Sequence, residues 1–131
     1  MVTWGRVARR APTVDPLLTK LRSEVSAHLA RNPRIRAKRR ARLLVSELTL
    51  DGVIRDIAAG GVFFRSDVLV EAGERGVLSV GKFLGLPVRV SFSRAESSDE
   101  DAGMILAFEP HEAEMELRIL DMVLDLIESA T

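Results

Sequence analysis

The sequence has no cysteine and no tyrosine, and its aromatic residues are five phenylalanines and one tryptophan. The absence of cysteine excludes disulfides, thiolate zinc sites and cysteine nucleophiles. Long apolar runs are also missing: none approaches a transmembrane span, and the N-terminal residues have no apolar segment of the length found in a signal peptide. We therefore expect no membrane span and a cytoplasmic location. A chain of 131 residues is long enough for one hydrophobic core without disulfides or metals.

The formal net charge of zero hides a strong asymmetry along the chain. Residues 1–65 carry 14 Lys+Arg against 5 Asp+Glu, net +9, whereas residues 66–131 carry 5 against 14, net −9. Seven of the cationic residues fall between Arg31 and Arg42. Such a run is often a solvated linker, but this one leads directly into the apolar residues 43–45. An anionic ligand is therefore expected in the first half of the chain.

Two segments have the pattern of amphipathic helices. Asp15 and Pro16 suit an N-cap and a first helical position, and leucines and a valine then recur at helical spacing until Asn32. We expect the residues before this helix to form a frayed arm. A second helix is expected after Pro110, with an apolar surface wider than one barrel face requires. The excess surface is expected to bury against the first helix or against a second subunit.

Between the helices, short β-prone segments alternate with turn signals. We predict a turn at Thr49–Gly52 and an acidic polar turn at Ser97–Ala102. The central feature is DIAAGGVFF, Asp56–Phe64, in which two glycines separate β-branched and aromatic residues. The spacing indicates six or so strands in a small antiparallel barrel or sandwich. The predicted strands are 43–48, 53–57, 62–64, 76–80, 86–92 and 103–108.

Residue patterns that would support catalysis are absent. The two histidines, His28 and His111, have no partner spacing that builds a triad or an acid–base pair. The segment Gly76–Lys82 formally resembles the start of a phosphate-binding P-loop, but Phe83 replaces the Ser or Thr that would bind magnesium, and the segment reads as a strand. We expect no enzymatic activity, no metal and no cofactor.

The basic run and the glycine turn together suit a guanine-containing anionic ligand. Arginine binds phosphate or a guanine edge through two parallel hydrogen bonds. A carboxylate such as Asp56 accepts hydrogen bonds from guanine N–H groups, and the adjacent glycines permit a close backbone approach.

From Arg34 to Leu126 the chain resembles the PilZ domain, a bacterial receptor module for cyclic di-GMP. Asp56, Ala58 and Gly61 fall on the family's D/N-x-S-x-x-G turn, and GMILAFEP is similar to the family's last strand and the entry to its closing helix. The resemblance implies a mainly β fold: a six-stranded antiparallel PilZ-like barrel with flanking N-terminal and C-terminal helices. It also implies an arm and helix over residues 1–33 and a barrel with its closing helix over residues 34–131.

Two features depart from the family pattern. Ala58 lacks the motif hydroxyl, which predicts weaker binding, because a hydrogen bond contributes about 0.5–3 kcal/mol. The family's RxxxR element has three possible registers here. They are Arg36 with Arg40, Lys38 with Arg42, and Ala30 with Arg34. The ligand residues that the resemblance implies are Arg34, Arg36, Arg39, Arg40, Arg42, Asp56, Ala58 and Gly61.

The resemblance leaves two functional hypotheses of nearly equal weight and a weaker third. The first is an adaptor or weak cyclic di-GMP receptor whose helices control a protein partner, or pair with a second copy, in motility, pilus control or surface behaviour. The second is a full-strength cyclic di-GMP receptor. The third, a barrel that binds single-stranded nucleic acid, is disfavoured because stacking platforms are missing. Four of the five phenylalanines, namely Phe63, Phe64, Phe92 and Phe108, fall in predicted strands, where burial is expected.

Overall fold

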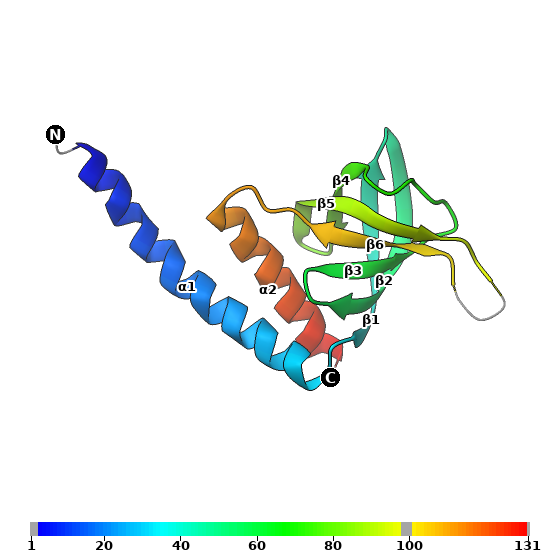
Figure 1. Cartoon of the computed structure of the whole chain (residues 1–131), viewed down its shortest axis with the longest axis horizontal. Helices are drawn as coiled ribbons and strands as arrows, with labels where there is room; N and C mark the ends of the chain where they lie inside the picture. The colour runs from blue at the N-terminus through cyan, green and yellow to red at the C-terminus, as the bar shows by residue number, and fades with distance from the viewer. Residues whose placement is uncertain (1–2, 98–100, 131) are drawn as a thin grey trace.

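Six strands form a closed antiparallel barrel with one helix before it and one after it (Figure 1). A computed structural model describes residues 3–97 and 101–130, with side chains described from residue 16 onward. The strand order around the barrel is β1-β2-β3-β6-β5-β4, which confirms the predicted fold class. The elements are α1 (Thr3–Arg31), β1 (Ile35–Val45), β2 (Leu48–Ala58), β3 (Gly61–Arg65), β4 (Arg75–Val80), β5 (Phe83–Arg94), β6 (Gly103–Phe108) and α2 (Ala113–Ala130).

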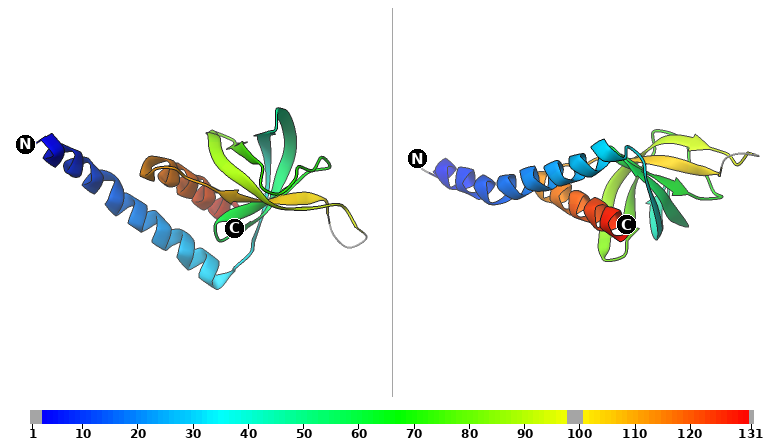
Figure 2. Two further views of the ribbon diagram at one scale, coloured as in Figure 1. Left: turned by 45° about the horizontal axis from the view of Figure 1, so that its top comes forward. Right: turned by 90° about the horizontal axis from the view of Figure 1, so that it is seen from below.

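The core fills the barrel and continues onto α2. Ile54, Phe64 and Leu106 are fully buried inside the barrel because alternate side chains of each strand point inward. Met122 and Ile127 of α2 are equally buried. Figures 1 and 2 show α2 lying between the barrel and α1. The broad apolar surface predicted for the second helix is therefore covered on two sides, by the barrel and by α1.

The first helix is longer than the sequence pattern predicts. It begins at Thr3 rather than at Asp15, so the expected frayed arm is wrong for the described residues. Pro12 and Pro16 lie inside the helix, although a proline normally disrupts a helix because it removes a hydrogen bond. Ala11 precedes the first proline and Leu17 and Leu18 follow the second, and alanine and leucine are good helix formers. The N-terminal half of α1 extends beyond α2 and the barrel (Figure 1). Within the described residues, no helix is long and apolar enough to cross a membrane.

The first hairpin also differs from the prediction. Strand β1 begins at Ile35 instead of residue 43, so the cationic run forms most of a strand and is not a linker. The turn lies at Ser46 and Glu47, which both have positive φ, 50° and 64°, as a two-residue hairpin turn requires. Gly52, predicted for a turn, lies within β2. A Cβ there would overlap the Arg65 carbonyl oxygen and the Phe64 ring, so this glycine permits close packing.

The DIAAGGVFF segment forms the predicted hairpin. Strand β2 ends at Ala58 and β3 begins at Gly61, with Gly60 in the left-handed region at φ 77°. The P-loop-like residues form β4 and the turn after it, which confirms their interpretation as a strand. Strand β6 matches its predicted bounds. Of the predicted acidic turn after β5, residues 98–100 lie outside the described residues.

Candidate ligand-binding site

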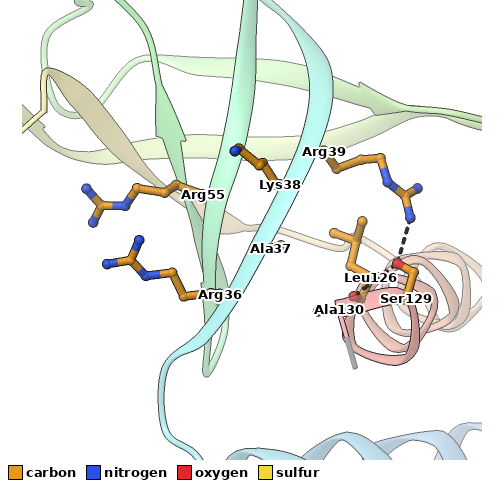
Figure 3. Close-up of a pocket in the computed structure, with 8 residues that line it drawn as sticks. All are labelled: Arg36, Ala37, Lys38, Arg39, Arg55, Leu126, Ser129 and Ala130. Atoms are coloured by element: carbon orange, nitrogen blue, oxygen red, sulfur yellow. Dashed lines mark hydrogen bonds between the residues drawn. The ribbon is translucent and has the colours of Figure 1, made fainter.

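The arginines of β1 are divided between two pockets. The register between β1 and β2 shifts between Arg36 and Arg39, which changes the direction of the side chains on either side of the shift. Arg36 and Arg39 line a pocket of about 460 Å³, here called the Arg36 pocket (Figure 3). Arg40 and Arg42 line a separate pocket of about 640 Å³. The lining residues of the Arg36 pocket are Arg36, Ala37, Lys38, Arg39, Arg55, Leu126, Ser129 and Ala130.

Only part of the predicted basic set is therefore brought together. Arg42 is paired with Asp51, with 2.9 Å between Arg42 Nε and Asp51 Oδ1. Arg34 is exposed and lies in the connection between α1 and β1. Arg36 and Arg39 remain as the two predicted arginines at one pocket, and Lys38 adds a third cation there.

Asp56 lies beside this pocket and is almost completely buried, with 4% of its surface exposed. Its Oδ2 accepts a hydrogen bond from Arg55 Nε at 2.8 Å and lies 2.6 Å from Arg55 Nη2. Its Oδ1 has no hydrogen-bond donor among the described residues. The cation nearest to this oxygen in an ion pair is Arg36, whose Nε lies 3.8 Å from Oδ1. A buried carboxylate oxygen without a donor is costly, so this oxygen is an acceptor site that a ligand N–H could satisfy.

Arg55 was not predicted as a site residue. Strict strand alternation would place it on the opposite face from Asp56, but the pairing of β2 with β3 shifts between Ile54 and Asp56. Arg55 consequently lines the Arg36 pocket and packs over the Phe63 ring, 4.2 Å from the ring centroid. Its position directly before the motif aspartate was the only sequence signal available.

Arg39 connects the pocket to α2. Its Nη2 donates to Ser129 Oγ at 2.7 Å, and its Nη1 lies 3.6 Å from Asp125 Oδ2. Figure 3 shows Arg39 directed toward α2, while Arg36 and Arg55 lie together on the other side of β1. The end of α2 therefore forms one wall of the pocket, and a β1 cation is bound to it.

The other turn positions lie in a different environment. Ala58 and Gly61 line a small pocket of about 180 Å³ beneath the two helices, among apolar residues that include Val25 of α1 and Ile119 of α2. A Cβ on Gly61 would overlap the Leu106 carbonyl oxygen, so this glycine permits the close pairing of β3 with β6. The structure therefore places Asp56 at the cationic pocket, and it places Ala58 and Gly61 against the helices.

Two carboxylates outside the Arg36 pocket have shifted pKa values. A hydrogen bond from Arg89 holds the pKa of Glu109 below its ordinary value, with Arg75 adding to the effect. A hydrogen bond from Arg22 likewise lowers the pKa of Glu116. Among the described residues, no group of three or more His, Cys, Asp or Glu side chains could hold a metal ion.

The sequence and the fold match a known family over most of the chain. The sequence model of the PilZ domain matches residues 28–125, and the chain belongs to the PilZ family. PilZ domains are non-catalytic modules that bind cyclic di-GMP, so family membership supports a regulatory role related to this nucleotide. No curated protein matches the sequence.

Solved structures share the fold at low sequence identity. The PilZ domain of CeSA from a cellulose-synthesizing bacterium is 18% identical with a TM-score of 0.57, and the match covers 71% of this chain and 96% of that one. The Bacillus subtilis inhibitor of motility MotI/DgrA is 18% identical with a TM-score of 0.52, covering 70% and 47%. MrkH of K. pneumonia in its apo state is 17% identical with a TM-score of 0.54, covering 74% and 49%. The match thus spans about half the length of the last two.

Proposed function

We propose that this chain is a non-catalytic signalling protein of the cyclic di-GMP network, acting as a weak cyclic di-GMP receptor that controls a protein partner. The observation that carries the proposal is Asp56 Oδ1, which is buried without a hydrogen-bond donor from any described residue, beside a pocket lined by four cations. The ligand supplies what this arrangement lacks. Guanine N–H groups are donors for a carboxylate, and phosphates accept from guanidinium and ammonium groups. A cytoplasmic location is part of the same proposal.

Arg36 is the cation best placed to meet a ligand from solvent. Its side chain is 83% exposed, and its Nε lies 3.8 Å from Asp56 Oδ1. It can therefore turn toward a phosphate without leaving a buried charge unpaired. Lys38 lies on the same pocket and adds a point charge.

Three features support weak rather than full-strength binding. Ala58 lacks the motif hydroxyl. The cations of β1 are divided between two pockets, so they cannot all contact one ligand. Arg39 must also leave Ser129 or Asp125 before it binds a phosphate with its full set of donors. Each feature reduces the net gain on binding, because lost contacts offset new ones.

The decisive experiment is isothermal titration of the purified protein with cyclic di-GMP, with GTP as the control ligand. We expect saturable binding in the micromolar range that is selective over GTP and weaker at physiological than at low salt, since the contacts are charged and partly exposed. Asp56→Ala should abolish the heat without lowering the cooperativity of thermal unfolding. Flat heats up to high micromolar ligand would overturn the proposal.

A ligand-independent adaptor is the second candidate, and one observation favours it. Ala58 and Gly61 line the apolar pocket beneath α1 and α2, so the turn also supports the helix pair. In this alternative the barrel displays the helices to a protein partner or to a second copy, in motility, pili or surface behaviour. Light scattering with and without cyclic di-GMP separates the two candidates. A mass unaffected by ligand, together with flat heats, favours the ligand-independent adaptor.

A further inference from the structure

Three arginines from three strands converge on one acidic residue, Asp101. Its Oδ2 lies 3.6 Å from Arg55 Nη1 of β2 and 3.7 Å from Arg65 Nε of β3. Its backbone oxygen accepts a hydrogen bond from Arg94 Nε of β5 at 3.1 Å. Asp101 belongs to the connection between β5 and β6, whose sequence AESSDEDA contains four acidic residues. The Asp101 carboxylate therefore lies next to the Arg36 pocket, at ion-pair distance from two of these arginines.

The donors of Arg55 are divided between two carboxylates. Nε and Nη2 contact Asp56 Oδ2, at 2.8 and 2.6 Å, while Nη1 faces Asp101. The Phe63 ring supports the plane of the guanidinium, at 4.2 Å. Because the side chain is only 21% exposed, it has little freedom to seek other partners. Nη1 is therefore the guanidinium nitrogen of Arg55 that pairs with Asp101.

We propose that Asp101 is an internal counter-ion that competes with the ligand phosphate for Arg55 and so sets the affinity of the Arg36 pocket. This inference rests on the proposed function. Carboxylate and phosphate use the same guanidinium donors, so occupation by one excludes the other. The negative charge of Asp101 also lowers the positive potential that attracts an anion to the pocket. Arg55, held on Asp56 and Phe63, is then a positioning residue for Asp56 and a phosphate donor once Asp101 withdraws.

Asp101→Asn tests the proposal, since it removes the charge and keeps the size of the side chain. In titrations at low salt we expect cyclic di-GMP to bind about three- to tenfold more tightly than to the unaltered protein, because a partly exposed charge pair is exchanged for a charged hydrogen bond. The gain should shrink as salt is added. Glu47→Gln is the matched control. It removes one exposed carboxylate from the β1–β2 turn, at the end of β1 farthest from Arg36, and should leave the affinity unchanged.

A second readout does not depend on ligand. The Arg55 side-chain Nε–Hε resonance, assigned by NMR through its loss in Arg55→Lys, should shift in Asp101→Asn and stay in place in Glu47→Gln. Asp101→Ala, measured alongside, shows whether any loss of folding comes from the asparagine itself. Unfolding midpoints of all variants confirm that the native state is being compared.

The outcomes separate this inference from the proposed function. Tighter binding by Asp101→Asn, with unchanged binding by Glu47→Gln, supports both the inference and the proposed function. Equal binding by the unaltered protein and Asp101→Asn overturns the inference and leaves the function in place. If neither protein binds, the proposed function is overturned. If the Arg55 resonance is also unmoved, the inference is overturned with it. A shifted resonance in that case still supports Asp101 as the counter-ion of Arg55.

Discussion

Arg36 and Asp56 face each other in register across β1 and β2, yet their side chains differ sharply in exposure, 83% against 5%. The 3.8 Å between Arg36 Nε and Asp56 Oδ1 is too long for a hydrogen bond. Asp56 is held instead by Arg55, on its other oxygen. The pair therefore combines a buried acceptor with a solvent-exposed cation, which suits a ligand that has both N–H donors and phosphate oxygens.

Asp56→Ala should weaken cyclic di-GMP binding by at least about tenfold, because the buried carboxylate acceptor is removed. Isothermal titration measures the effect. Asp51→Ala removes the carboxylate that pairs with Arg42 at the other pocket and should leave the affinity within about twofold. Equal losses in the two variants would mean that general electrostatics, and not the Asp56 acceptor, determines binding.

The two pockets predict different roles for neighbouring arginines. Arg36→Ala should reduce affinity about five- to fiftyfold, since it removes a charge-assisted hydrogen bond to phosphate, whereas Arg40→Ala should have little effect. The same titration with both single variants is the measurement. A larger loss in Arg40→Ala would show that the ligand lies in the second pocket, with Arg42 and Asp51.

The barrel can be predicted from the sequence because most of its strands are short β-prone segments bounded by turn residues. Strand β6 and the β2–β3 hairpin are examples, with small or β-branched residues and glycines at the expected places. The start of β1 was missed because cations dominate residues 36–42, although Ile35 and Ala41 are its buried positions. Gly52 resembled a turn residue but is required by the Phe64 ring. Tertiary packing, which local patterns do not encode, decided both cases.

The candidate site was predictable only in part, for a similar reason. Asp56 follows from its motif and from its place before the glycine turn. Arg55 and Asp101 could not be predicted as site residues. Register shifts in the pairing of β2 with its neighbours, and the contact between residues far apart in the sequence, bring them together. Which of the cations share a pocket depends on the register shift after Arg36, and no spacing in the sequence reveals that shift.

Arg39→Gln should loosen the end of α2. The substitution removes the ion pair with Asp125 and weakens the hydrogen bond to Ser129, so we expect a loss of about 0.5–1.5 kcal/mol in unfolding free energy. Amide hydrogen exchange should become faster over the last turn of α2 and stay unchanged in β6. Lys38→Gln is the control, because it removes a neighbouring charge of the same pocket. Unchanged exchange at the end of α2 would show that apolar packing, including that of Leu126 and Ile127, is sufficient to hold it.

The packing of α1 on α2 should depend on pH through Glu116. Arg22 Nε and Nη2 donate to the two carboxylate oxygens of Glu116 at 2.7 and 2.6 Å, and this hydrogen bonding holds the pKa of Glu116 below its ordinary value of 4.5. A carboxylate whose pKa is lower in the folded state stabilises the fold above its unfolded pKa. That contribution is lost as the pH falls through the folded pKa.

Glu116→Gln should therefore lower the unfolding free energy by about 0.2–1 kcal/mol at neutral pH, as for other partly exposed pairs. The difference from the unaltered protein should hold down to about pH 5 and shrink toward zero in stronger acid. Chemical denaturation at a series of pH values measures both. Glu114→Gln removes the same charge from the same first turn of α2 and therefore controls for the helix dipole. If both variants lose stability equally and with the same pH dependence, the dipole explains the effect and the Arg22 pair contributes nothing measurable.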